Sequence, residues 1–172
     1  LVVSDMTRFW MRQDLVVPHL VDYLTERCGV REEDITIVIA NGTHIGGDEQ
    51  ELRTLVTDAV YDHVKVKNHD CEAKDLVYLG TTPHGTPVSI DRTAAEADLV
   101  VCLGAVTHHV MAGFGGGRKS ILPGISGRET IFHNHAFSLD AAQLRSNPAI
   151  GNGVLKGNPL HEDMCEAAGL VK

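Results

Sequence analysis

Aromatic residues are scarce in this sequence, and other features that mark common protein classes are missing as well. Only 5% of the residues are aromatic, which excludes a surface built for stacking nucleic-acid bases. The net charge of −8 also argues against a nucleic-acid partner, because surfaces that bind phosphate backbones are basic. The cysteines, at positions 28, 71, 102 and 165, form no CxxC pair, so we do not expect a disulfide scaffold. Reduced thiols indicate the cytoplasm.

Long apolar runs are absent too. No stretch approaches the roughly eighteen apolar residues that a membrane-spanning helix needs, so we expect no membrane partner. The first residues also lack the basic and apolar regions of a signal peptide. The chain is nevertheless 43% hydrophobic, which suits a packed core and excludes a disordered segment. A length of 172 residues fits a single domain covering residues 1–172.

Both ends of the sequence have the pattern of interrupted elements. Leu1 to Val3 has the apolar, β-branched character of the last part of a strand. At the other end, a helix is predicted over 158–168, and residues 170–172 have the pattern of the start of another element. We therefore expect a fragment of a longer chain.

Apolar patterning predicts strands that alternate with helices. The two most apolar strands are predicted over 34–40 and 99–103, with shorter ones over 64–68, 76–79 and 87–90. Helices are predicted over 14–28, 48–56, 92–97 and 130–144. This alternation is typical of an α/β fold, a layered and mainly parallel sheet flanked by helices.

Polar residues of similar chemistry follow three of the predicted strands. Asp5 and Arg8 follow the first strand, His44 follows the second and His109 follows the strand over 99–103. In open α/β sheets, ligands bind beyond the carboxyl ends of the strands, where such loops meet. Polar residues are also common at strand ends for structural reasons. Their recurrence at three ends favours one shared site.

The glycine-rich segment around Gly115 to Gly117 is the sharpest local pattern. Three consecutive glycines allow a ligand to approach the main chain, and Arg118 and Lys119 place cations beside it, so the loop could bind an anion. A nucleotide-binding P-loop is a rival interpretation, but Arg118 stands where that motif needs glycine. A glycine turn packed against the sheet is the structural alternative.

The histidines divide into two groups. His133 and His135 are two residues apart, so on a helix only one of them can face the glycine loop. His108 and His109 are adjacent, and in an extended segment they point to opposite sides. No spacing supports a four-ligand zinc site. Structural or surface roles are expected for the five histidines that lie outside any motif, His19, His63, His69, His84 and His161.

These motifs together resemble the nickel-pincer lactate racemase family, whose members are 2-hydroxy acid racemases and epimerases. The matching segments are Asp5-x-Thr7-Arg8, Gly42-Thr43-His44, the run from His109 through Ala-Gly-Phe-x-Gly-Gly-x to Lys119, Pro123-Gly124 and His135. They occur in the family order and at similar intervals. The sequence departs from the family pattern at Phe9, where proline is usual, and at Ile45-Gly46-Gly47, which replaces an Arg-Pro-like continuation. The resemblance identifies the chain as part of the N-terminal domain of a two-domain protein.

The resemblance also implies a cofactor and a role for each motif residue. The cofactor is a nickel-pincer nucleotide, a pyridinium bis-thiocarboxylate-type mononucleotide that carries nickel and is covalently attached at Lys119 through a thioamide. His135 supplies the protein ligand to nickel. His44 and His109 are the paired acid and base. The segment Asp5, Thr7 and Arg8 contacts cofactor or substrate, and the second domain supplies further contacts to the substrate.

The mechanism implied by the resemblance is proton-coupled hydride transfer. One histidine removes the hydroxyl proton while C2 gives its hydride to the cofactor, which leaves a planar 2-oxo acid. The hydride returns to the other face, and the second histidine returns a proton to the oxygen. Two alternatives remain from other classes: a module that binds the cofactor or an organic anion without turnover, and a metal hydrolase with histidine ligands, which the lack of a clustered ligand set disfavours.

Overall fold

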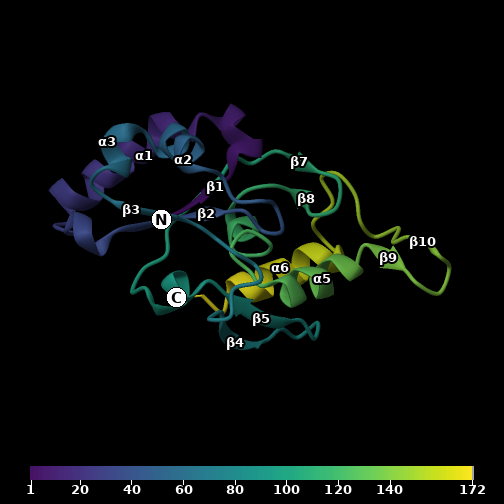
Figure 1. The fold of residues 1–172 in the computed structure, drawn as a ribbon. Helices are drawn as coiled ribbons and strands as arrows, with labels where there is room; N and C mark the ends of the chain where they lie inside the picture. Colours follow the sequence, from purple (N-terminus) through teal and green to yellow (C-terminus); the bar gives the residue numbers. More distant parts are fainter. Residues whose placement is uncertain (172) are drawn as a thin grey trace.

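A four-stranded parallel sheet lies at the centre of the computed structural model, which describes residues 1–171 (Figure 1). Its strands are β1 (Val2–Ser4), β2 (Thr36–Ala40), β3 (Lys65–Asn68) and β6 (Cys102–Leu103), in the spatial order β3-β2-β1-β6. Val2 of β1 lies opposite Val38 on one side and Cys102 on the other. The prediction of an α/β fold with a mainly parallel sheet is confirmed.

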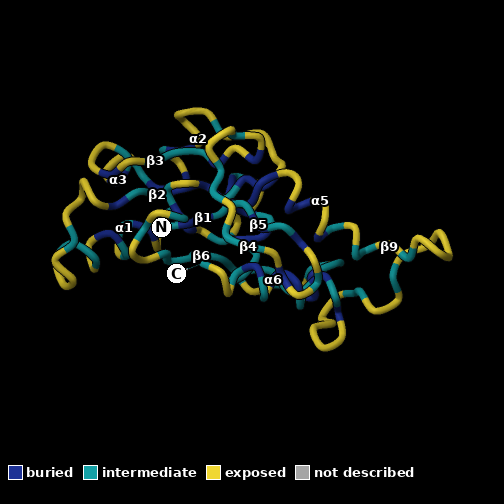
Figure 2. The backbone as a smooth tube through the Cα atoms, turned by 90° about the horizontal axis from the view of Figure 1, so that it is seen from below, coloured by how far each residue is buried: buried dark blue, intermediate teal, exposed yellow. Residues whose placement is uncertain are grey.

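Helices cover both faces of this sheet because successive strand residues point to opposite sides. Val3, Ile37 and Ile39 are buried on one face, under α1 (Gln13–Asp22), α2 (Glu49–Val56) and α3 (Asp58–Tyr61). Val2 and Val38 are buried on the other face, with residues of α5 (Arg128–Ala136), α6 (Pro159–Ala168) and the antiparallel hairpin of β4 (Val77–Thr81) and β5 (Pro87–Ile90). Figure 2 shows buried backbone along the inner strands and exposed backbone in the outer turns.

Several predicted helices are confirmed, and their caps explain where they begin. Asp48 and Glu51 form a capping box at the start of α2, in which each side chain accepts a hydrogen bond from the other residue's backbone amide. Asn158 caps α6, and Pro159 occupies the first helical position, where its missing N–H costs nothing. α1 continues through a π-helical turn, Tyr23–Arg27, and α4 spans Arg92–Glu96.

Two predictions about element length are wrong. The helix expected over 130–144 stops at Ala136, because Ser138 Oγ donates to the carbonyl of His135 at 2.7 Å and Asn147 Nδ2 donates to that of Phe137 at 2.9 Å. A small hairpin follows, β9 (Leu139–Asp140) and β10 (Arg145–Ser146). The strand expected over 99–103 is shorter in the structure, where β6 comprises only Cys102–Leu103, although the Val2 N–H also donates to the carbonyl of Val101 at 2.8 Å.

Two features remain outside the layers. The β9–β10 hairpin extends away from the body of the domain (Figure 1), and a second hairpin, β7 (His108–His109) with β8 (Gly113–Phe114), lies close to the sheet. Residues 170 and 171 form no further strand or helix, and Lys172 lies outside the described residues. None of the helices in residues 1–171 is both long enough and apolar enough to cross a membrane.

Candidate functional site

The three strand ends that carry polar residues meet at one edge of the sheet. β2, β1 and β6 are neighbours and run in the same direction, so Asp5, His44 and His109 all leave the sheet on the same side. They line a cleft of about 630 Å³, a volume typical of sites for small molecules and cofactors. The cleft also contacts Arg8, Lys119 and His135. The structure thus brings together six of the seven predicted site residues.

The seventh predicted site residue, Thr7, does not line this cleft but forms hydrogen bonds with Asp5 and Arg8, which do. Its backbone N–H and its hydroxyl both donate to Asp5 Oδ1, at 3.2 and 2.5 Å, and this capping interaction begins the 3₁₀ turn Met6–Met11. Its Oγ1 accepts a hydrogen bond from Arg8 Nη1 at 2.8 Å. Thr7 itself lines a smaller adjoining hollow. The segment is therefore one hydrogen-bonded unit that carries Arg8 into the cleft.

Asp5 also holds His44, a contact that the sequence does not reveal. Asp5 Oδ2 lies 2.5 Å from His44 Nδ1, and Asp5 is only 8% exposed whereas the His44 side chain is 52% exposed. A carboxylate can only accept, so Nδ1 carries the proton and Nε2 keeps its lone pair. This is the tautomer that a general base requires.

The loop that presents His44 is fixed by Asn68 at the end of β3. Asn68 Nδ2 donates to the carbonyl of Gly47 at 2.8 Å, and its Oδ1 accepts from the Gly47 N–H at 3.1 Å. Asn41 Nδ2 donates to Asn68 Oδ1 as well, and also to the carbonyl of His69. A Cβ atom on Gly46 would lie 2.8 Å from Asn68 Cγ, which explains glycine there. No sequence motif marks Asn68, and only its position at the end of a predicted strand could have suggested a role.

His109 and Lys119 form a direct pair. Lys119 Nζ lies 2.9 Å from His109 Nε2, while His109 Nδ1 accepts hydrogen bonds from the backbone N–H groups of Met111 and Ala112 at 3.2 and 3.1 Å. A neutral His109 with Nδ1 as acceptor carries its proton on Nε2, and that proton can be donated only to a neutral amine. Burial and then the charge of Lys119 lower the pKa of His109 to about 4.

Lys119 lies among cations without a carboxylate to neutralise it. Within residues 1–171, no carboxylate lies within ion-pair distance of its amine. Burial, then the charges of Arg8 and Arg118, lower the pKa of Lys119 to about 8. The neutral, nucleophilic amine is therefore far more populated at pH 7 than for an ordinary lysine.

Of the two histidines in α5, His135 is the one that lines the cleft. Its Nδ1 donates to the carbonyl of Ile131 at 2.9 Å, which leaves the lone pair on Nε2, and burial lowers its pKa. His133 instead contacts Thr86 Oγ1 at 2.9 Å, outside the cleft. His108 also borders the cleft, but its ring stacks on Phe114 with centroids 5.0 Å apart.

The glycine loop serves the fold as well as the cleft. A Cβ atom on Gly116 would lie 3.0 Å from the carbonyl oxygen of Ala105, at a backbone φ of +74°, so glycine is needed there for close packing on the segment after β6. Arg118 places its cation against the loop rather than in the cleft, because its guanidinium binds loop carbonyls.

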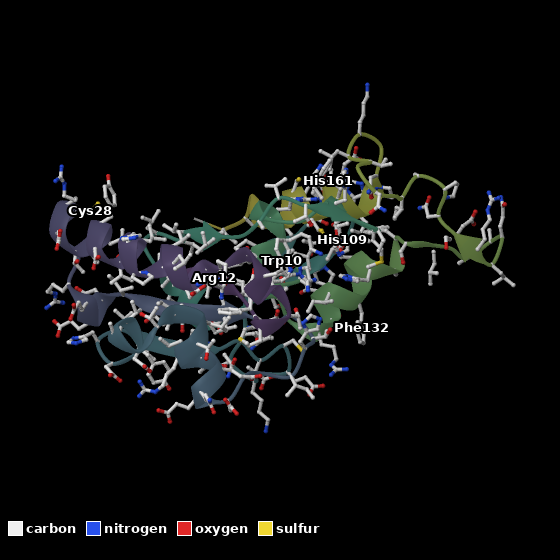
Figure 3. All side chains as sticks on the ribbon, turned by 90° about the horizontal axis from the view of Figure 1, so that it is seen from above. Trp10, Arg12, Cys28, His109, Phe132 and His161 are labelled. Atoms are coloured by element: carbon white, nitrogen blue, oxygen red, sulfur yellow. The ribbon has the colours of Figure 1, made fainter. Side chains whose placement is uncertain are left out.

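The five histidines outside the motifs have the expected structural or surface roles. His19 and His63 are exposed, buried His69 contacts the carbonyl of Ser126 at 2.9 Å, and His84 contacts Glu166 at 2.8 Å. His161 also has a structural role, because its Nδ1 accepts a hydrogen bond from Arg118 Nε at 3.0 Å. Trp10 and Phe132, labelled with His109 in Figure 3, also line the cleft, whereas His161 does not.

Known proteins match this chain closely. Residues 1–146 match the family model described as the lactate racemase N-terminal domain. A lactate racemase of Thermoanaerobacterium thermosaccharolyticum is 34% identical over 98% of this chain and 38% of its own length. A lactate racemase of Lactiplantibacillus plantarum is 32% identical over 100% of this chain and 39% of its own length. This chain therefore spans well under half of either protein.

Solved structures agree with these sequence matches. The structure of the lactate racemase apoprotein from T. thermosaccharolyticum superposes with a TM-score of 0.87 at 34% identity, over 98% of this chain and 39% of that one. A crystal structure of a Thermotoga maritima protein gives a TM-score of 0.73 at 23% identity, over 98% of this chain and 41% of that one, and supports the fold alone. With most of its length matched by the family model, the chain belongs to the lactate racemase N-terminal domain family.

Proposed function

We propose that this chain carries the cofactor-binding and proton-transfer residues of a racemase or epimerase that acts on a small 2-hydroxy acid of the lactate type. The observation that supports this most directly is the convergence of His44, His109, Lys119 and His135 on one cleft. A second domain of the longer protein completes the site in this proposal, since the chain spans only 38% or 39% of the relatives' length. Its free cysteines fit a cytoplasmic enzyme.

The residues of the cleft fit a nickel-pincer nucleotide. Lys119 offers an amine that burial and neighbouring cations keep partly neutral, which suits covalent attachment as an amide-type nitrogen. His135 offers Nε2 as a metal ligand, with Nδ1 fixed by a backbone carbonyl as is usual for metal-bound histidines. When bound, the cofactor supplies the acceptor and donor of hydride for C2 of the substrate.

His44 acts as the base that removes the hydroxyl proton in one direction of turnover. The Asp5 carboxylate holds Nδ1–H and stabilises the imidazolium that forms when Nε2 takes up the proton. His109 acts at the other face of the substrate: as the imidazolium it returns a proton from Nε2 to the oxygen, which leaves the neutral imidazole whose Nδ1 is held by the Met111 and Ala112 N–H groups. Reversal of these two roles gives the opposite direction.

Arg8 binds the substrate carboxylate. Its guanidinium lines the cleft, and its hydrogen bonds to Thr7 fix only one of its nitrogens, so the others remain available as donors. A guanidinium binds a carboxylate through two parallel hydrogen bonds. This holds the substrate in place while hydride leaves one face of C2 and returns to the other.

The alternatives make different demands on the site. A histidine-ligated hydrolase needs clustered ligands, but within residues 1–171 the one cluster of metal-ligating side chains is His84, Asp163 and Glu166, none of which lines the cleft. A binding module without turnover would use the same cleft, so it is separated from the racemase only by an activity measurement.

The test uses the full-length protein, produced with and without the enzymes that make the cofactor. Chiral chromatography should detect racemisation of lactate or a related 2-hydroxy acid only in the cofactor-loaded protein, and intact mass should show an adduct. Lys119→Ala should abolish the adduct and the activity, whereas the exposed control Lys156→Ala should retain both. An adduct without racemisation of any 2-hydroxy acid would favour the binding module. An undiminished adduct in Lys119→Ala would assign the attachment to another residue.

A further inference from the structure

Arg118 precedes Lys119 in the chain. Lys119 lines the cleft, whereas the Arg118 side chain forms hydrogen bonds with the backbone of the glycine loop. Nη2 donates to the carbonyls of Ala112 and Phe114 at 2.7 and 3.0 Å, and Nη1 contacts those of Gly115 and Gly116 at 3.5 and 3.3 Å. One guanidinium thus binds four carbonyl oxygens of a single loop. Only arginine among the side chains has enough donors in a rigid plane for this.

The same guanidinium ties the loop to α6. Arg118 Nε donates to His161 Nδ1 at 3.0 Å, and Asn158 Nδ2, at the start of the helix, donates to the carbonyl of Met111 at 2.9 Å. Both ends of the segment from Met111 to Arg118 are therefore held by one helix. Leu160 and Met164 anchor that helix in the core, where both are 0% exposed.

We call the hydrogen bonds of Arg118 to the four loop carbonyls and to His161 the Arg118 clamp. This clamp determines where Lys119 and His109 lie. The backbone N–H of Lys119 donates to the carbonyl of Gly116 at 3.2 Å, one of the carbonyls that Arg118 binds. The N–H of Ala112 orients His109, and the carbonyl of Ala112 is bound by Arg118. A loosened loop would therefore misplace both members of the pair.

Other charged groups also face the Lys119 amine. They are Arg8 from the turn after β1, His109 from β7 and His135 from α5, together with Arg118 on its own loop. Asp5 lies on the same cleft, but its two oxygens are engaged by Thr7 and His44. Arg118 contributes one of the cations that lower the pKa of Lys119.

We propose that Arg118 is a positioning residue for Lys119: by binding four loop carbonyls and His161, it fixes the loop that presents the Lys119 amine and His109 to the cleft. The inference rests on the proposed function only in naming Lys119 as the attachment point. The clamp acts in the protein before any cofactor is bound.

The test measures Lys119 directly in full-length protein made without cofactor. Isotope-coded acetic anhydride labels neutral amines: the amine attacks one carbonyl carbon, acetate leaves and the amine proton passes to water. Peptide mass spectrometry across pH 6–11 gives the labelling midpoint of Lys119, with exposed Lys156 as an internal reference. Hydrogen exchange of residues 113–117 reports the mobility of the loop.

Three variants separate the effect of Arg118 on the mobility of the loop from the effect of its charge on the labelling midpoint of Lys119. Arg118→Gln should raise the Lys119 midpoint by about one pH unit and speed exchange in the loop about tenfold. Arg118→Lys keeps the charge but cannot span the carbonyls, so exchange should rise while the midpoint stays low. His161→Ala should raise exchange alone. Arg145→Gln, on the β9–β10 hairpin, should change neither quantity.

Hydrogen exchange of the loop decides whether Arg118 has this positioning role. Faster exchange confined to residues 113–117 in Arg118→Gln and Arg118→Lys supports the proposal. Unchanged loop exchange, with or without a shifted midpoint, overturns it, as does faster exchange that extends equally to the strands of the sheet. If the loaded enzyme lacks racemase activity while these results hold, the proposed function fails and the clamp stands.

Discussion

Replacement of Lys119 by methionine should raise the pKa of His109. The two nitrogens are 2.9 Å apart, and at the acidic pH where His109 titrates, Lys119 carries a full positive charge because its pKa is about 8. That charge opposes protonation of the imidazole. Methionine keeps much of the length and the apolar stem while it removes the charge, so the packing of the cleft changes little.

Coulomb's law sets the size of the effect. Two unit charges at this separation repel by about 1.4 kcal/mol even at the dielectric constant of water, which corresponds to about one pKa unit. The pKa of His109 should therefore rise from about 4 to about 5. It should stay below the ordinary value of about 6.5, because burial is the largest cause of the shift and is retained.

The pKa of His109 can be measured by imidazole-selective nitrogen NMR between pH 3 and 8, in protein without cofactor and with Lys156→Met as the matched control. Unfolding should also report it. The unfolded chain binds a proton that the folded protein excludes between about pH 4 and 6.5, so stability falls as the pH drops through this window. Lys119→Met should weaken that dependence. An unchanged or lower His109 pKa in this variant would refute the pairing described here.

Three further predictions address single residues. Asp5→Asn should lower kcat of the loaded enzyme about a hundredfold with little change in KM, because the amide no longer stabilises a charged His44; a wild-type kcat would contradict the dyad. His44→Ala should retain nickel and lose racemisation in both directions, whereas His135→Ala should lose nickel as well, and metal analysis that finds the reverse would exchange their assignments. Met164→Ala should reduce the free energy of unfolding by about 2–5 kcal/mol in urea titrations, whereas Leu144→Ala, at a position 93% exposed, should have almost no effect; equal losses would contradict the described core.

The elements of the fold could be predicted where local pattern and tertiary packing agree. β2 is a near-continuous apolar run, and buried strands of parallel sheets have this pattern. α2 begins where its capping residues indicate. Prediction fails after Ala136, because the helix ends through hydrogen bonds from Ser138 and Asn147 that no periodicity reveals.

The positions of the site residues could be predicted better than their partners. The carboxyl ends of neighbouring parallel strands lie at one edge, so Asp5, His44 and His109 were expected together, and all three line the cleft. Their pairings depend on contacts between residues far apart in sequence. The contact of Asp5 with His44 spans thirty-nine positions, and that of Arg118 with His161 spans forty-three. No local motif carries that information.

α6 also bears on where this unit can be divided. The helix begins at Pro159, beyond residue 146 where the family match stops, yet Leu160, Met164 and Ala167 are each 0% exposed in the core. A protein shortened at residue 146 would expose the apolar side chains of the core that α6 covers. It would also lose Asn158 and His161, which hold the glycine loop. Such exposed apolar surface promotes aggregation. A graft, a circular permutation or a complementation fragment must therefore retain the chain through Ala168, because the end of the family-model match at residue 146 is not the boundary of cooperative folding.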